Sequence, residues 1–303
     1  MIKLDKKKSL YADMALVLVA IIWGSGFVVT KNGLEDMTPL FMNAMRFIIA
    51  SILMSIVFFK KLKTVNKSDI IAGAIIGSFL FSAFAAQTVG LQFTTASKQA
   101  FLTATNVVMV PFLFWFISKR KPHNLEILAT FITLLGIGFL TLEGGVALNS
   151  GDLLTLLCAL LFAGHIISIG HFSKKHDPIV LTILQFIFAA IFSIILAVPL
   201  EPINLQVSGQ GWFTVIYLGG MSTLVAFLIQ NIAQKYTTST HTAIILSLEA
   251  VFGTLFSILL LGELFTIKMV IGSGIIFMGI ITAETKWNFL RKKSNKIERQ
   301  NLQ

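Results

Sequence analysis

Charged residues are scarce in this sequence. Only 13% of the 303 residues are charged, whereas 55% are hydrophobic and the mean hydropathy is +0.84. A soluble protein of this length could not cover its surface with so few charges. The composition excludes a soluble globular protein and predicts a single membrane domain over residues 1–303.

Other features that carry chemistry in soluble proteins are also missing. There is one cysteine, Cys158, which excludes a disulfide framework. No loop has the glycine spacing of a P-loop, and His171 and His176 lack the spacing and the third ligand of a zinc site. We therefore expect no cofactor, no metal and no enzymatic activity. The net charge of +10 resides in short clusters between apolar runs, so we also expect no nucleic-acid partner.

Long apolar runs, in contrast, fill the chain. Runs of about 20 residues match a bilayer core about 30 Å thick. The sequence predicts an all-α membrane protein with ten transmembrane helices, and the first run is too long to be a cleaved signal. The predicted spans are 12–30, 40–59, 70–91, 98–118, 124–142, 152–170, 179–199, 211–232, 240–261 and 267–285.

Lysine and arginine are distributed unevenly between the two sides of these spans. One side carries Lys3, Lys6, Lys7, Lys8, Lys60, Lys61, Lys63, Lys67, Lys119, Arg120, Lys121, Lys174, Lys175, Lys235 and the basic tail 286–303. The other side has only Lys31, Lys98 and Lys268, together with several carboxylates. This asymmetry places both termini in the cytoplasm, and the expected location is the plasma (inner) membrane of a bacterium.

The two halves of the chain share an internal repeat. Asp13, Pro39 and Phe47 recur 139 residues later as Asp152, Pro178 and Phe186. Gln87 and Gly136 recur 143 residues later as Gln230 and Gly279. We predict repeat one at 11–143 and repeat two at 151–285. Because each repeat has five helices, the second is inverted, an arrangement that supports alternating access in transporters.

Several fragments of the sequence resemble a known family. They are AIIWGSGF at 20–27, MRF at 45–47, GLQFTTAS at 90–97, LSLE at 246–249 and LGE at 261–263. Together, in this order, they resemble the EamA family of the drug/metabolite transporter superfamily over nearly the whole chain. The resemblance implies ten helices, export or exchange of small metabolites, and a central cavity lined mainly by helices one, three, four, six, eight and nine.

Polar side chains inside the spans are the candidates for substrate binding, because an ionisable group at a helix centre costs about 2.5–3.5 kcal/mol. Glu249 lies near mid-membrane in the ninth span. Two stripes with i, i+4, i+7, i+11 spacing share a helix face and are predicted to line a polar cavity. They are Thr242, Leu246, Glu249, Gly253 and, in the fourth span, Gln99, Thr103, Asn106, Val110. The alternative for Glu249 and Asn106 is a structural role in helix packing.

Six further residues are candidates: Trp23, Gln87, His165 and Gln230 for substrate binding, and Arg46 and Lys98 for coupling or gating. Gln87 and Gln230 are related by the repeat, and Trp23 is a candidate cavity wall with Phe27 and Phe84. Glu249, His165, Arg46 and Lys98 are the candidates for coupling or gating. The structural alternatives are that His165 is a hydrogen-bonded core residue, that Arg46 extends to the membrane interface, and that Lys98 is an interfacial lysine.

The sequence thus predicts a secondary transporter, or permease, that exports small metabolites such as amino acids or related compounds by alternating access. Its partners are the lipid bilayer and a small-molecule substrate, and homodimerisation is left open. The main alternative is a membrane-embedded enzyme acting on lipid or lipid-linked substrates. The absence of a clustered catalytic motif argues against it.

Overall fold

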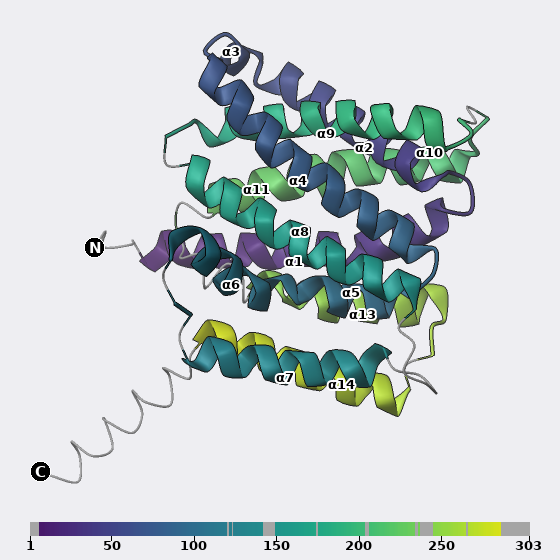
Figure 1. Ribbon diagram of the computed structural model, residues 1–303. Coiled ribbons are helices and arrows are strands. Elements are labelled where there is room, and N and C mark those ends of the chain that lie inside the picture. Colours follow the sequence, from purple (N-terminus) through teal and green to yellow (C-terminus); the bar gives the residue numbers. More distant parts are fainter. Residues whose placement is uncertain are drawn as a thin grey trace, which may run out of the picture.

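The computed structural model is a bundle of helices whose long axes run side by side (Figure 1). It describes residues 6–119, 121–122, 124–141, 149–173, 175–203, 206–233, 236, 245–264 and 266–285. Within these residues every regular element is a helix. The first half contains α1 (Lys6–Gly33), α2 (Pro39–Val57), α3 (Phe59–Leu62), α4 (Lys67–Leu91), α5 (Ala96–Ala104), α6 (Asn106–Ser118) and α7 (Asn124–Thr141). The second contains α8 (Ser150–Phe172), α9 (Pro178–Leu200), α10 (Gly209–Ile216), η1 (Tyr217–Val225), α11 (Ala226–Ala233), α13 (Leu248–Leu261) and α14 (Ile267–Thr285).

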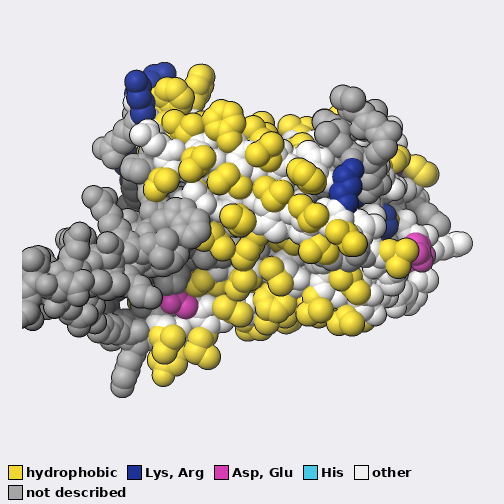
Figure 2. Space-filling model, turned by 90° about the horizontal axis from the view of Figure 1, so that it is seen from below, with side chains coloured by type: hydrophobic (Ala, Val, Ile, Leu, Met, Phe, Trp, Pro, Cys, Tyr) yellow, Lys and Arg dark blue, Asp and Glu magenta, His cyan; other side chains and the backbone are white. Residues whose placement is uncertain are grey.

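Seven of the helical segments described are long and apolar enough to cross a membrane. Three apolar helices are shorter, namely Ile127–Phe139, Leu248–Leu261 and Ile267–Thr282. Their outward faces carry large hydrophobic side chains. Figure 2 shows these side chains across the middle of one face, with charged side chains toward the two ends. This distribution suits a body surrounded by lipid tails.

Local sequence explains where many helices begin and end. Pro39 and Pro178 stand at the first turns of α2 and α9, where a missing N–H costs nothing. Asn66 and Asp69 form a capping box at the start of α4. Gly262, with φ +66°, adopts the left-handed conformation that terminates α13.

The two halves are interleaved rather than separate. The principal helix pairs are α7 with α14, α4 with α8 and α9, α2 with α9, and α1 with α13, and each joins the first half to the second. The pair of α1 and α13 approaches closely at two glycines. A Cβ on Gly24 would lie 2.8 Å from the backbone nitrogen of Gly253, so a glycine at this position allows the two helices to pack closely.

Three predicted spans are less regular than expected. The span predicted at 98–118 is divided at Thr105, whose hydroxyl donates to the carbonyl of Leu102 (2.6 Å). Pro111 then leaves the carbonyl of Val107 without an N–H partner from the helix. The span predicted at 211–232 contains the π-helix η1 between α10 and α11. In the ninth span, residues 240–244 lie outside the described residues, and Ser247 marks a break before α13.

The bundle has two chemically distinct ends. At the end where α1 begins and α14 finishes lie Lys60, Lys61, Lys63 and Lys67, and we call it the lysine end (Figure 1). At the opposite end lie Asp36, Glu201 and Glu263, and we call it the carboxylate end.

Candidate functional site

A cavity of about 280 Å³ lies in the middle of the bundle. Its lining comes from both halves: from α1, α2, α4, α5 and α6 in the first, and from α8, η1, α11 and the start of α13 in the second. The lining residues are Trp23, Gly26, Phe27, Thr30, Arg46, Phe84, Gln87, Gln99, Thr103, Ala104, Asn106, Val107, Val110, Pro111, Phe162, His165, Ile166, Leu218, Ser222, Phe227, Gln230, Leu246, Ser247 and Glu249.

The sequence-predicted residues gather at this cavity. Ten of the predicted site residues belong to the described part of the chain, and nine of them line the cavity. The nine are Trp23, Arg46, Gln87, Gln99, Thr103, Asn106, His165, Gln230 and Glu249. Lys98 is buried in α5 but does not line the cavity, and Thr242 lies outside the described residues. Gly253, the last member of its stripe, packs against α1 instead of lining the cavity. A role of these residues in substrate binding stays a prediction.

The helix breaks place the two central polar residues. Asn106 is the first residue of α6, directly after the break at Thr105. Glu249 is the second residue of α13, directly after Ser247. At both breaks an i→i+3 bond replaces the regular helical one, from Val108 to Thr105 (3.1 Å) and from Ala250 to Ser247 (3.2 Å). Interrupted helices that begin at a central cavity supply free amide and side-chain groups to bound solutes.

Three of the lining residues carry side-chain oxygens without hydrogen-bond partners among the described residues. Gln99 donates through Nε2 to the backbone oxygen of Gln87 (2.7 Å) and to Thr155 Oγ1 (3.3 Å). Its Oε1 atom, like that of Gln230, is buried with no hydrogen-bond partner among the described residues. Glu249 likewise has no hydrogen bond or ion pair within the part of the chain that the structure describes. The lining residues therefore hold acceptor capacity that the described part of the protein does not use.

Arg46 brings a positive charge to the cavity from α2. Its Nε donates to Thr223 Oγ1 (3.1 Å) and its Nη2 to Ser222 Oγ (3.4 Å), both in η1. The guanidinium lies over the Phe84 ring, with Cζ 4.2 Å from the centroid. No carboxylate of the described residues pairs with it, so three of its five N–H donors are left for other acceptors.

Aromatic side chains form the apolar part of the wall. Trp23 lies against Phe227 (centroids 5.1 Å apart), and its Nε1 donates to the backbone oxygen of Ser222 (2.8 Å). Phe84 and Phe162 meet edge to face at 5.3 Å. His165 is buried beside these rings and bonds through Nε2 to Gln185 Oε1 (2.9 Å). This partner agrees with the reading of His165 as a hydrogen-bonded core histidine that also borders the cavity.

Sequence reasoning missed some lining residues. Thr30 and Ser222 were not singled out, although both follow helical spacing from residues that were. Thr30 is seven residues after Trp23, and Ser222 is eight residues before Gln230. Continuing the helical spacing by two turns from Trp23 and from Gln230 would have found them. Metal sites are not indicated either: no group of three or more candidate ligands occurs among the described residues.

Known proteins with similar sequences point to one family. The sequence model of the EamA-like transporter family matches residues 10–142 and, a second time, residues 149–284. A protein of Archaeoglobus fulgidus named as an uncharacterized transporter is 37% identical over 278 residues, covering 90% of this chain and 86% of that protein. The uncharacterized transporter YoaV of Bacillus subtilis is 23% identical over 288 residues, covering 92% of this chain and 98% of the other.

A solved structure supports the fold independently. A crystal structure with 15% sequence identity superposes with a TM-score of 0.67 over 92% of this chain and 98% of that one. At this identity the similarity concerns the fold alone.

Proposed function

Because the chain belongs to the EamA-like transporter family and is thus a multi-pass transporter of the cell membrane, we propose that it carries small metabolites, such as amino acids or related compounds, by alternating access of the central cavity. We further propose that it acts as an exporter. The observation that carries this proposal is a central cavity lined by both halves, at which acceptors, a cation and aromatic rings lie together.

The topology that goes with this proposal has ten spans. The three shorter apolar helices would complete the seven long ones, giving inverted repeats at 11–143 and 151–285. The lysine end would face the cytoplasm, together with both termini and the tail 286–303, as the distribution of lysine and arginine predicts. The matching helix breaks at Thr105 and Ser247 support the repeat relation.

The composition of the cavity supports an amphiphilic solute. The oxygens of Gln99, Gln230 and Glu249 suit N–H donors, and Arg46 suits an anionic group. Four aromatic rings suit an apolar side chain. An amino acid combines these three features.

The size of the cavity argues against the enzyme alternative. Pockets for small molecules measure about 300–1,000 Å³. At about 280 Å³ the cavity is at the lower limit, which suits a metabolite rather than a lipid with its chains.

Flux measurements test the proposal. Proteoliposomes with the wild type are loaded with labelled amino acids and metabolites, and efflux is compared with empty liposomes and with Glu249→Gln. We expect a chemically unchanged solute to cross with the wild type, and its flux to fall at least tenfold in the variant, because a charged hydrogen bond contributes about 1.5–3 kcal/mol.

The control is Glu35→Gln, which removes an exposed carboxylate outside the cavity. It should transport like the wild type. Equal flux through Glu249→Gln would show that Glu249 is structural, and chemical conversion of the solute without flux would favour the enzyme alternative.

A further inference from the structure

Equivalent residues precede the second helix of each half, but only one of them caps its helix. Thr38 precedes Pro39, and Asp177 precedes Pro178. Asp177 caps its own helix, accepting from the backbone N–H of Ile179 (2.9 Å). Thr38 makes no side-chain cap, and its hydroxyl is buried without a partner among the described residues.

The missing cap of α2 comes from the other half. Glu201, which follows α9, accepts from the backbone N–H of Leu40 through both oxygens (3.0 Å each) and from that of Phe41 (3.0 Å). The start of α2 is therefore fixed to the end of α9 across the interface between the repeats.

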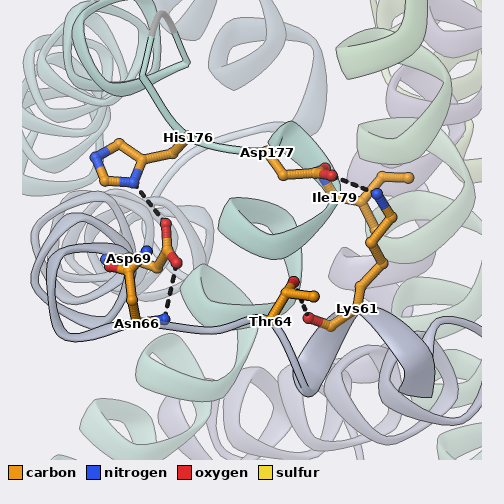
Figure 3. Close-up of polar contacts among 7 residues, drawn as sticks. All are labelled: Lys61, Thr64, Asn66, Asp69, His176, Asp177 and Ile179. Atoms are coloured by element: carbon orange, nitrogen blue, oxygen red, sulfur yellow. Dashed lines mark hydrogen bonds and ion pairs between the residues drawn. The ribbon is translucent and has the colours of Figure 1, made fainter.

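The matching contact at the lysine end has another chemistry. Lys61, which follows α2, bonds through Nζ to Asp177 Oδ2 (2.5 Å) before α9 (Figure 3). In both places the end of one second helix meets the start of the other. At the carboxylate end the carboxylate binds backbone amides, whereas at the lysine end it binds an ammonium group.

A second pair of contacts repeats this pattern. At the lysine end, His176 Nδ1 bonds to Asp69 Oδ1 (2.5 Å), joining the loop before α9 to the start of α4 (Figure 3). At the carboxylate end, Asp36 in the loop before α2 accepts from the backbone N–H of Ser208, which caps α10 (2.9 Å). The third helix of each half is thus joined at its start to the loop before the second helix of the other half.

We propose that these contacts are the two gates of the transporter, and that Glu201 is the principal latch of the carboxylate end. This inference rests on the alternating-access function proposed above. In this proposal, opening of that end separates the start of α2 from the residue after α9, and the amides of Leu40 and Phe41 exchange the Glu201 carboxylate for water. Glu263 holds α5 in the same way, accepting from the backbone amides of Ala96 (2.8 Å) and Ser97 (3.0 Å).

Comparison of the two halves suggests a variant that removes the Glu201 contact but still caps α2. In Thr38→Asp/Glu201→Ala, α2 would be capped by its own aspartate, as Asp177 caps α9. The helix start remains capped, but its hydrogen bonds to the Glu201 carboxylate after α9 are lost. The matched control is Glu35→Ala, which removes an exposed carboxylate at the same end.

The rate of cysteine labelling in membranes measures how far the gate at the carboxylate end is open. The native Cys158 is replaced by alanine, and Thr30→Cys reports from the cavity on the carboxylate-end side of α1. The reagent is a charged, membrane-impermeant thiosulfonate applied to one side at a time. A separate Glu35→Cys protein establishes which side the carboxylate end faces.

We expect the double variant to label roughly fivefold faster than the wild type from the carboxylate-end side, with no rise from the other side. Glu35→Ala should label like the wild type. A monodisperse double variant with an unchanged rate would overturn the proposal and leave Glu201 as a structural cap. The readout needs no substrate, so a failure of the transport proposal would appear separately, as absence of flux in the liposome assay.

Discussion

The two halves are joined at both ends of the bundle by carboxylates, but the groups that the carboxylates bind differ. At the carboxylate end, Glu201 and Asp36 bind backbone N–H groups of the opposite repeat. At the lysine end, Asp177 and Asp69 bind the side chains of Lys61 and His176. Backbone amides carry no net charge, whereas the Lys61 ammonium group forms an ion pair with Asp177, which salt screens. The contacts at the two ends can therefore be changed separately, although the two halves of the chain match the same family model.

The largest expected effect on stability comes from a substitution at the carboxylate end. Glu201→Ala should lower the free energy of unfolding by about 2 kcal/mol, because three charge-assisted bonds to helix amides are lost. Loss of helicity on titration with a denaturing detergent measures it. Adding Thr38→Asp should restore about half, since it caps the helix but not the interface. A loss below about 0.5 kcal/mol would show that water replaces the carboxylate without cost.

A smaller effect is expected at the lysine end, from Asp177→Ala. Burial disfavours ionisation of Asp177, but hydrogen bonds from Lys61 and from the amides of Ile179 and Val180 outweigh it, so the pKa of Asp177 is lowered. A lowered pKa means that the stabilisation is fully present above the ordinary value of 3.8 and is lost as the pH falls through the lowered one.

Thermal unfolding of wild type and Asp177→Ala over a pH series measures this. The difference should be about 1 kcal/mol at neutral pH and should shrink below pH 3.8. A difference that persists unchanged in acid would mean that the cap does not depend on the charge. Glu201→Ala measured over the same series shows whether the two ends differ.

The smallest effect concerns the exposed partner at the lysine end. Lys61→Met should change stability by about 0.5 kcal/mol or less, because the pair is partly exposed and screened by solvent. Raising the salt concentration should remove even this difference. Melting temperatures at low and high salt test it, with Lys60→Met as the control. A salt-independent loss would instead point to packing of the lysine stem.

Much of the architecture could be predicted from sequence, because the bilayer imposes long apolar spans. The starts of α2 and α9 follow from Pro39 and Pro178, and the shared cavity face follows from the spacing of Gln99, Thr103 and Asn106. The membership in the EamA-like family was also predicted, and the match over both halves confirms it.

Other features depend on contacts that no local pattern encodes. The π-helix η1 occurs where Arg46 and Trp23 of the first half bond to Ser222 and Thr223 of the second. Similarly, nothing near Thr38 indicates that its helix is capped by Glu201, more than 160 residues away. Such contacts require the tertiary structure, because the partner is chosen by helix packing and not by spacing.

The pairing of α7 with α14 has a consequence for the symmetry of the fold. Gly136 in α7 faces Ile276 in α14, where an added Cβ would lie 2.7 Å from the backbone nitrogen. Gly279 in α14, the repeat-related glycine, faces Ala129 in α7 at 3.0 Å from its carbonyl oxygen. One glycine position thus serves both sides of the same interface. This reciprocity is the defining property of an isologous dimer contact, here contained within one polypeptide. The surface around the two glycines is therefore self-complementary, because the same position of each half meets the other half.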